Sequence, residues 1–132
     1  MLSKLLFYSP SFIGYVRREG QDESVFDNLL KRGPVGVAVD ANEYWFSYKS
    51  GLFDSPCGSG INHAVTLVGY NETKPDDCNN GGAYWIIRNF WSPGWGESGN
   101  MRVKVNKSNT FSCNIEKYAY QTNGFTTNWT NY

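Results

Sequence analysis

After Pro34 the chain consists of short segments rich in β-branched and aromatic residues, separated by clusters of glycine and proline. Segments of this length and composition are typical of β-strands, because branched and aromatic side chains pack well on a pleated surface. The predicted strands in this region are residues 35–39, 63–70, 83–89, 100–105 and 118–122. One more strand is predicted before them, at residues 12–17. This pattern restricts the fold to a mainly β class.

One helix is predicted ahead of these strands. Residues 22–24 are polar residues of the kind that begin helices, and two apolar pairs spaced four residues apart follow them. Gly33 and Pro34 are typical of the end of a helix. The apolar pairs are Val25 with Leu29 and Phe26 with Leu30. The sequence therefore predicts one amphipathic helix of about ten residues near the N-terminus, and the fold class is α+β, mainly β.

The size and composition of the chain indicate a single globular domain. A chain of 132 residues has room for one domain, and we expect it over residues 12–122, between a poorly defined segment at 1–11 and a tail at 123–132. Aromatic residues make up 17% and charged residues 18%, which favours a buried core over disorder. Twelve basic residues balance twelve acidic ones, which argues against nucleic acid or an anionic membrane as a partner.

Two further kinds of feature are not expected. The chain has no apolar run of the roughly 18 residues that a transmembrane helix needs, and residues 1–10 lack the pattern of a secretory signal peptide. Three cysteines without a Cys-x-x-Cys pair, together with one histidine, argue against a zinc site. We therefore expect no metal and no cofactor, and at most one disulfide within the chain.

His63 is the one histidine of the chain, so acid–base chemistry near neutral pH is assigned to it first. A histidine at the start of a strand is more often a structural hydrogen-bonding residue than a catalyst, by a ratio of about three to one. Asn89 is a candidate partner, but it can equally be a turn residue ahead of the glycine-rich loop. Both interpretations stay open for both residues.

The pairing of two predicted strands links these candidates. If residues 63–70 and 83–89 pair antiparallel around an exposed polar connection at 71–82, Tyr70 comes opposite Gly82 and His63 opposite Asn89. The same register places Val65 on Ile87 and Leu67 on Trp85 as a buried apolar ladder. Asn89 would then bond one imidazole nitrogen and leave the other free, as an orienting group does for a general base.

Four ordered motifs carry a resemblance to a known family. They are NHAV at residues 62–65, VGY at 68–70, YWIIRNFW at 84–91 and GWGESG at 94–99, with GPVGV at 33–37 and SGLF at 50–53 upstream. Together they resemble the C-terminal half of the papain-like cysteine peptidases, the cathepsin group. The resemblance spans roughly residues 12–122 and implies the right-hand, antiparallel β-barrel-like domain of that fold.

The resemblance also implies roles for individual residues. His63 would form the ion pair with a cysteine thiolate and later protonate the leaving amine, and Asn89 would orient the imidazole. Trp91 resembles the tryptophan that covers the bond between these two side chains, although it can also be a plain core aromatic. Residues implied to line the substrate cleft are Ala38, Asn62, Ala64, Trp91, Trp95 and Tyr118. Tyr118 would make the main specificity pocket shallow.

The family's nucleophile is not expected within this chain. That cysteine lies about 130 to 150 residues before the histidine, whereas 62 residues precede His63 here. The family's oxyanion glutamine would lie outside the chain with it. Cys57 is followed by Gly58 and Ser59, which loosely echoes the nucleophile signature, but no aromatic residue and no helix-forming run follow it. The chain alone is therefore expected to be inactive.

The leading hypothesis is the C-terminal portion of a thiol peptidase, which would act on peptide or protein substrates once combined with the cysteine-bearing half. The alternative is a non-catalytic pseudopeptidase that binds peptides or protein inhibitors. Phe90 stands where the family usually has serine, and a large side chain there would either tilt Asn89 away from His63 or point outward. A third hypothesis, an extracellular carbohydrate-binding domain, rests only on Trp91, Trp95 and the glycine-rich loop.

The resemblance implies one disulfide and a cellular setting. Cys57 and Cys113 correspond to a pair of cysteines that are bonded in this family, which leaves Cys78 over. The bridge would contribute about 4 kcal/mol on a chain-entropy estimate. A secreted, lysosomal or vacuolar location is likewise implied by the family.

Overall fold

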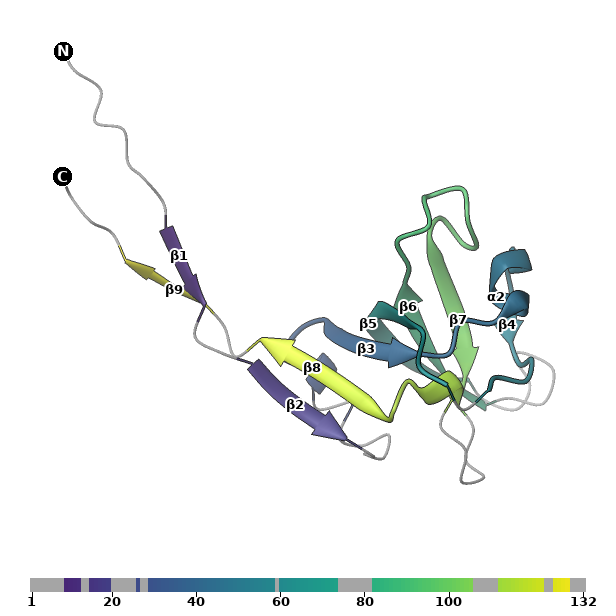
Figure 1. Cartoon of the computed structure of the whole chain (residues 1–132), viewed down its shortest axis with the longest axis horizontal. Helices are drawn as coiled ribbons and strands as arrows, with labels where there is room; N and C mark the ends of the chain where they lie inside the picture. Colours follow the sequence, from purple (N-terminus) through teal and green to yellow (C-terminus); the bar gives the residue numbers. More distant parts are fainter. Residues whose placement is uncertain are drawn as a thin grey trace, which may run out of the picture.

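The computed structural model describes residues 9–12, 15–19, 26, 29–58, 60–73, 82–105, 112–122 and 125–128. Seven strands form one sheet in the order β2-β8-β3-β5-β6-β7-β4, and β1 pairs with β9 in a ribbon that extends away from it (Figure 1). Neighbouring strands are antiparallel except for β4 and β7. The elements are β1 (Ser9–Phe12), β2 (Tyr15–Glu19), β3 (Val35–Val39), α2 (Glu43–Ser47), β4 (Leu52–Phe53), β5 (His63–Thr73), β6 (Gly82–Arg88), β7 (Asn100–Lys104), η1 (Ser112–Asn114), β8 (Tyr118–Thr122) and β9 (Phe125–Asn128).

The predicted fold class is confirmed, because the described residues are mostly strand with few helical ones. β3 and β8 have the predicted bounds, while β5 continues three residues further to Thr73 and β6 begins one residue earlier, at Gly82. The first predicted strand lies at β2, three residues further along at its start than expected. The described sheet is not a closed barrel, because β2 and β4 are separate edges.

Several short elements were not predicted. The helix α2 has five residues and β4 has two, and both are too short for a periodic pattern to emerge. Part of the predicted tail, β9, pairs with β1 at the other end of the chain. Such pairing depends on two distant segments meeting, which local composition does not encode.

The helix predicted near the N-terminus lies largely outside the described residues. Those that are described agree with it: Phe26, Leu29 and Leu30 are helical, and Phe26 and Leu29 are buried. The segment then turns through Gly33, whose φ of 142° suits glycine. Gln121 of β8 donates from its amide to the carbonyls of Leu29 and Gly33 at 2.8 and 2.9 Å. It thereby adds a second hydrogen bond to the Leu29 carbonyl, which also accepts from the Arg32 N–H at 2.9 Å, and bonds the Gly33 carbonyl at the turn.

The hydrophobic core forms where strand residues alternate between buried and partly exposed positions. Val35, Val37 and Val39 of β3 are buried in turn, and β6 and β7 show the same alternation. Trp85 of β6 is completely buried, with Phe26 at 5.8 Å and Tyr70 at 4.8 Å between ring centroids. This core fixes the ends of β5 and β6, where the candidate site lies.

The carboxyl group of Glu116 is buried at the edge of this core. Glu116 is 5% exposed, and its two oxygens accept from the Trp85 indole at 2.6 Å and from the Ser112 backbone N–H at 2.7 Å. Burial raises the pKa of the Glu116 carboxyl above its ordinary value of 4.5. The folded state therefore holds this proton more tightly than the unfolded chain does. The stability that Glu116 contributes is fully present below pH 4.5 and is lost as the pH rises through the folded-state pKa.

Replacing Glu116 with glutamine should therefore remove a pH-dependent part of the stability. The amide can accept from only one of the two donors, and leaving the other buried N–H unpaired should cost about 1–3 kcal/mol. The difference in unfolding free energy between wild type and Glu116→Gln should be larger at pH 4 than at pH 7. Urea unfolding at both pH values measures it, with the exposed Glu43→Gln as control. A difference that is the same at both pH values would contradict the argument.

Candidate functional site

The structure brings His63 and Asn89 together. His63 is the first residue of β5, and Asn89 directly follows β6, so both lie at the same end of two paired strands. The imidazole Nε2 and the Asn89 Oδ1 are 2.8 Å apart. Asn89 is 4% exposed and His63 is half-buried, so the pair is partly shielded from water.

The register that predicted this contact is wrong. Leu67 lies opposite Ile87 rather than Trp85, and beyond an irregularity between Leu67 and Gly69, Tyr70 lies opposite Trp85 rather than Gly82. The reason is that β5 runs on to Thr73 and that the irregularity moves the two halves of the ladder by one residue relative to each other. The two side chains meet all the same: the pairing of Thr66 with Arg88, continued one step past β6, places Asn89 opposite Val65, which shares a face of β5 with His63.

The hydrogen bonds of the Asn89 amide determine the tautomer of His63. The backbone N–H of Phe90 donates to Asn89 Oδ1 at 2.8 Å, which identifies that atom as the oxygen. An amide oxygen can only accept, so Nε2 of the neutral imidazole must carry the proton and donate to it. The other ring nitrogen, Nδ1, is then the basic one. This is the arrangement that a general base with an orienting partner requires.

Phe90 does not disturb this geometry. Its side chain is 70% exposed and points outward, while Asn89 stays bonded to His63. Of the two outcomes considered for a phenylalanine at this position, the outward-pointing side chain is the one found, and Asn89 is not tilted away from His63. The backbone of Asn89 is held as well, since its N–H donates to the Gly99 carbonyl at 2.9 Å.

Trp91 lies against the histidine ring. The ring centroids of Trp91 and His63 are 5.0 Å apart with an interplanar angle of 28°, and Phe46 lies at 4.9 Å and 12° from the same indole. The observed register, extended past β6, places Trp91 opposite His63, which accounts for the contact. A ring at this position displaces water from one side of the imidazole, and a less polar surrounding strengthens its hydrogen bond to Asn89.

Trp95 packs inside the protein. It is 8% exposed, and its indole N–H donates to the Trp45 carbonyl at 2.8 Å. Its ring meets Trp91 edge-on at 5.3 Å. The side chain thus supports Trp91 in this structure, and a direct contact between Trp95 and a substrate stays a prediction.

Three of the other predicted cleft residues form a row across the sheet. Ala64 of β5 is paired with Ala38 of β3, and the pairing of Val37 with Ala119 places Tyr118 of β8 opposite Ala38 one step further on. Residues directly opposite in antiparallel strands share a face, so Ala64, Ala38 and Tyr118 share one face of the sheet. Val37, which alternates with them, faces the core. Their contact with a ligand is untested.

Asn62 connects the segment before His63 to the end of β3. Its amide donates to Asp40 Oδ1 at 2.9 Å and accepts from the Ala41 N–H at 2.9 Å, while its backbone N–H donates to the Val39 carbonyl at 3.1 Å. Asp40 is 8% exposed and was not singled out from the sequence. Its position directly after a predicted strand was the one available signal.

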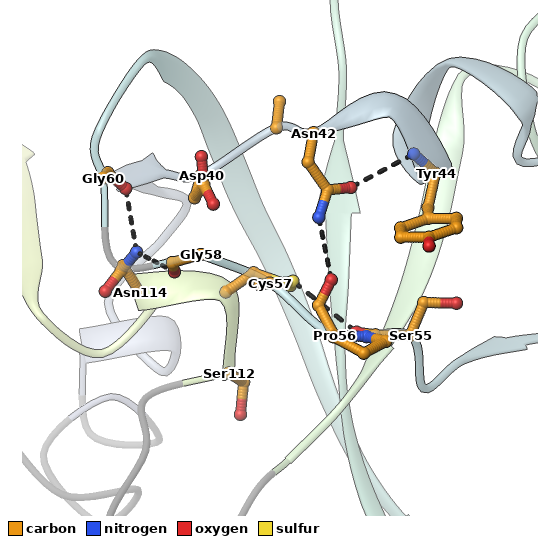
Figure 2. The surroundings of a disulfide bond; sticks show 12 residues. Asp40, Asn42, Tyr44, Ser55, Pro56, Cys57, Gly58, Gly60, Ser112 and Asn114 are labelled. Carbon is orange, nitrogen blue, oxygen red and sulfur yellow. Dashed lines mark hydrogen bonds between the residues drawn. A yellow bond between two sulfur atoms is a disulfide. The ribbon is translucent and has the colours of Figure 1, made fainter.

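The predicted disulfide is confirmed. Cys57 and Cys113 are bonded, with their Cα atoms 5.0 Å apart. Next to the bridge, the Asn114 amide donates to the carbonyls of Gly58 and Gly60 at 3.3 and 2.9 Å (Figure 2). The bridge and this amide together fix the segment that leads into His63. Cys78 lies outside the described residues.

An ion pair fixes the loop that follows Trp91. Arg102 of β7 binds both oxygens of Glu97, at 2.6 Å and 3.0 Å, and Glu97 also accepts from the Gly51 N–H at 2.9 Å. The hydrogen bond from Arg102 holds the pKa of the Glu97 carboxyl below its ordinary value. Within the same loop, Gly96 has a φ of 57° and lies so close to the Asn100 carbonyl that a Cβ would clash with it at 2.5 Å.

Two kinds of feature are absent from the described part of the chain. No group of three or more histidine, cysteine, aspartate or glutamate residues there could hold a metal ion. Among the same residues, no helix has the length and apolar character needed to cross a membrane.

Comparison with known proteins gives consistent matches. A family model described as papain family cysteine protease matches residues 8–123. Chymopapain from Carica papaya is 41% identical over 109 residues, which are 81% of this chain and 29% of chymopapain. Fruit bromelain from Ananas comosus is 38% identical over 89 residues, which are 67% of this chain and 23% of that protein. The chain thus spans less than a third of the length of these curated relatives.

Solved structures match in the same way. Bromelain from Ananas comosus in complex with the E64 inhibitor has a TM-score of 0.73 and 38% identity, over 84% of this chain and 50% of that one. Digestive procathepsin L2 from Tenebrio molitor larval midgut has a TM-score of 0.71 and 33% identity, over 84% of this chain and 34% of that one.

Proposed function

Because this chain belongs to the papain family of cysteine proteases, we propose that it supplies the histidine and the orienting asparagine of a thiol peptidase. The nucleophilic cysteine and the oxyanion glutamine would come from sequence outside these 132 residues. Residues 12–122 would form the C-terminal domain of that peptidase. Cys57 is excluded as the nucleophile, since its sulfur is bonded to Cys113.

The observation that carries this proposal is the hydrogen bond between His63 and Asn89, which leaves Nδ1 as the basic nitrogen. A thiol placed beside Nδ1 would transfer its proton there and become the thiolate that attacks the peptide carbonyl. The imidazolium would then return the proton to the leaving amine as the carbon–nitrogen bond breaks. Water would attack the resulting thioester, with His63 again taking and returning the proton.

Asn89 and Trp91 would act on the imidazole and not on the substrate. The Asn89 oxygen accepts from Nε2–H in both the neutral and the protonated state of His63, so the ring keeps its orientation throughout the cycle. Trp91 covers one side of the imidazole and limits its exposure to water. Both groups would stabilise the ion pair between thiolate and imidazolium.

The substrate would be a peptide or protein that lies along the row formed by Ala64, Ala38 and Tyr118. The two alanines have small side chains that would leave room for a substrate, and Tyr118 would close one end of the pocket and make it shallow. Asn62, next to His63, would line the same cleft. Inhibitors of the E64 type would bind at the same place, and the similar bromelain structure is a complex with E64.

A secreted, vacuolar or lysosomal location is part of the proposal. The bond between Cys57 and Cys113 supports it, because disulfides persist in oxidising compartments and are rare in the cytosol.

The proposal is tested by supplying the other half of the site. This chain is mixed with the cysteine-bearing N-terminal domain of a papain-family protease, and the mixture is treated with a tagged epoxide inhibitor and a fluorogenic peptide. We expect labelling and hydrolysis in the mixture and in neither part alone. A stable complex that neither labels nor hydrolyses would overturn the proposal in favour of a non-catalytic module that binds peptides or inhibitors.

A further inference from the structure

Phe46 is an exposed aromatic residue close to the candidate site that the proposed function does not use. Its side chain is 65% exposed, yet its ring lies nearly parallel to that of Trp91, with centroids 4.9 Å apart. Trp91 is in turn stacked on His63. Phe46, Trp91 and His63 therefore form a series of three rings, which we call the aromatic stack. It connects the helix α2 to the catalytic imidazole of the proposed function.

The helix α2 holds Phe46 in this position. Trp45, the residue before Phe46, is completely buried, and its carbonyl accepts the indole N–H of Trp95. At the start of the helix the side chain of Asn42 accepts from the Tyr44 N–H at 3.1 Å and donates to the Pro56 carbonyl at 2.7 Å (Figure 2). With α2 anchored in the core and to the segment before the disulfide, Phe46 is presented outward over Trp91.

Trp91 depends on its ring neighbours for its position. It follows the last residue of β6 by three positions and lies in a loop, so no strand pairing holds it. Its ring contacts are Phe46 and His63, both parallel to the indole, and Trp95, which meets it edge-on. Removing Phe46 would take away one of the two parallel contacts and open the indole to water.

We propose that Phe46 is a positioning residue, which holds Trp91 against His63 and thereby maintains the Nε2–H tautomer that is bonded to Asn89. An indole that moves away admits water to the imidazole, and water competes with Asn89 for the Nε2 proton. The importance of this for peptide hydrolysis rests on the proposed function. The effect on the tautomer is a property of this chain and can be measured without a substrate.

The single histidine makes the measurement unambiguous. Nitrogen NMR of the ¹⁵N-histidine-labelled chain, at a pH where the imidazole is neutral, gives the ratio of the Nε2–H to the Nδ1–H tautomer. In Phe46→Ala this ratio should fall about threefold to tenfold, the factor expected for the loss of one aromatic pair. Phe46→Tyr keeps the ring and should restore the wild-type ratio. Tyr44→Ala, which removes another exposed aromatic from the same helix, should leave the ratio unchanged.

The outcomes separate this inference from the proposed function. An unchanged tautomer ratio in Phe46→Ala overturns the positioning role, whatever the peptidase assay gives. So does a lower urea midpoint for Phe46→Ala without a change in the two nitrogen signals, since that marks a purely structural residue. If the ratio falls as expected but the reconstituted complex hydrolyses no peptide, the positioning role stands and the peptidase proposal fails.

Discussion

Replacing His63 with alanine should lower kcat/KM of the reconstituted peptidase by at least about 10³-fold, the scale of loss when a member of a catalytic nucleophile–base unit is removed. A thiol with an ordinary pKa of about 8.5 is mostly protonated at neutral pH, so without Nδ1 little thiolate forms. The leaving amine would also lack its proton donor. Hydrolysis of a fluorogenic peptide by the complex, compared with the wild-type complex, measures the loss.

A matched control keeps this result interpretable. Val68 lies on the same strand as His63 and is 44% exposed, so Val68→Thr keeps a β-branched side chain on β5 and should retain full activity. Binding of each variant to the cysteine-bearing domain, measured by calorimetry, shows whether the complex still forms. His63→Ala that binds normally and retains more than a tenth of the activity would contradict the role assigned to His63.

Asn89→Ala should lower kcat/KM of the same complex less than His63→Ala does. The imidazole base remains in this variant, and only its orientation is lost.

The strands show most clearly how much of the fold could be predicted from the sequence. β3 and β8 have the predicted bounds, and in both strands buried residues alternate with more exposed ones: Val35, Val37 and Val39 are buried in β3, and Ala119 and Gln121 in β8. In this part of the chain, local composition and tertiary burial favour the same structure. The short helix α2 had no such agreement, since five residues provide little more than one helical turn.

The candidate site was predicted by residue identity and not by geometry. The sequence identified His63 and Asn89, but it placed them opposite each other in a register that the structure does not have. The irregularity between Leu67 and Gly69 cannot be read from composition, because it depends on how both strands pack. The contact between the two side chains survives because the observed register, continued past β6, places Asn89 opposite Val65, on the face of β5 that His63 shares.

The contacts that support the site were the least predictable part. Phe46 and Trp91 are 45 positions apart by number and meet because α2 is anchored through Trp45 and Asn42. Asp40 meets Asn62 for a similar reason, since the end of β3 lies beside the start of β5. Nothing within either local segment signals such pairs, whereas the disulfide followed from the family resemblance.

Removing the bond between Cys57 and Cys113 should have the largest effect on stability. The two cysteines are 56 residues apart, and opening a loop of that length should lower the unfolding free energy by about 4 kcal/mol through the entropy of the unfolded chain. For a domain of this size that is a large part of the total, which is typically about 5–15 kcal/mol. Urea unfolding of the Cys57→Ser/Cys113→Ser double variant measures the loss, and the reduced wild-type chain should match it. Equal midpoints for the oxidised and reduced wild type would contradict the expectation.

The same variant distinguishes two ways in which the bridge could act on His63. If the bridge stabilises the fold only by restricting the conformations of the unfolded chain, the native arrangement around His63 should persist in the double variant below its unfolding transition. We expect this outcome, because Asn114 still binds the Gly58 and Gly60 carbonyls and the Asn62 N–H still binds Val39 when the sulfurs are gone. The His63 nitrogen signals of the double variant should therefore match those of wild type. A shift in those signals in the still-folded variant would mean that the bridge itself orders the segment leading into His63, and Asn114→Ala should then produce a similar shift with the bridge intact.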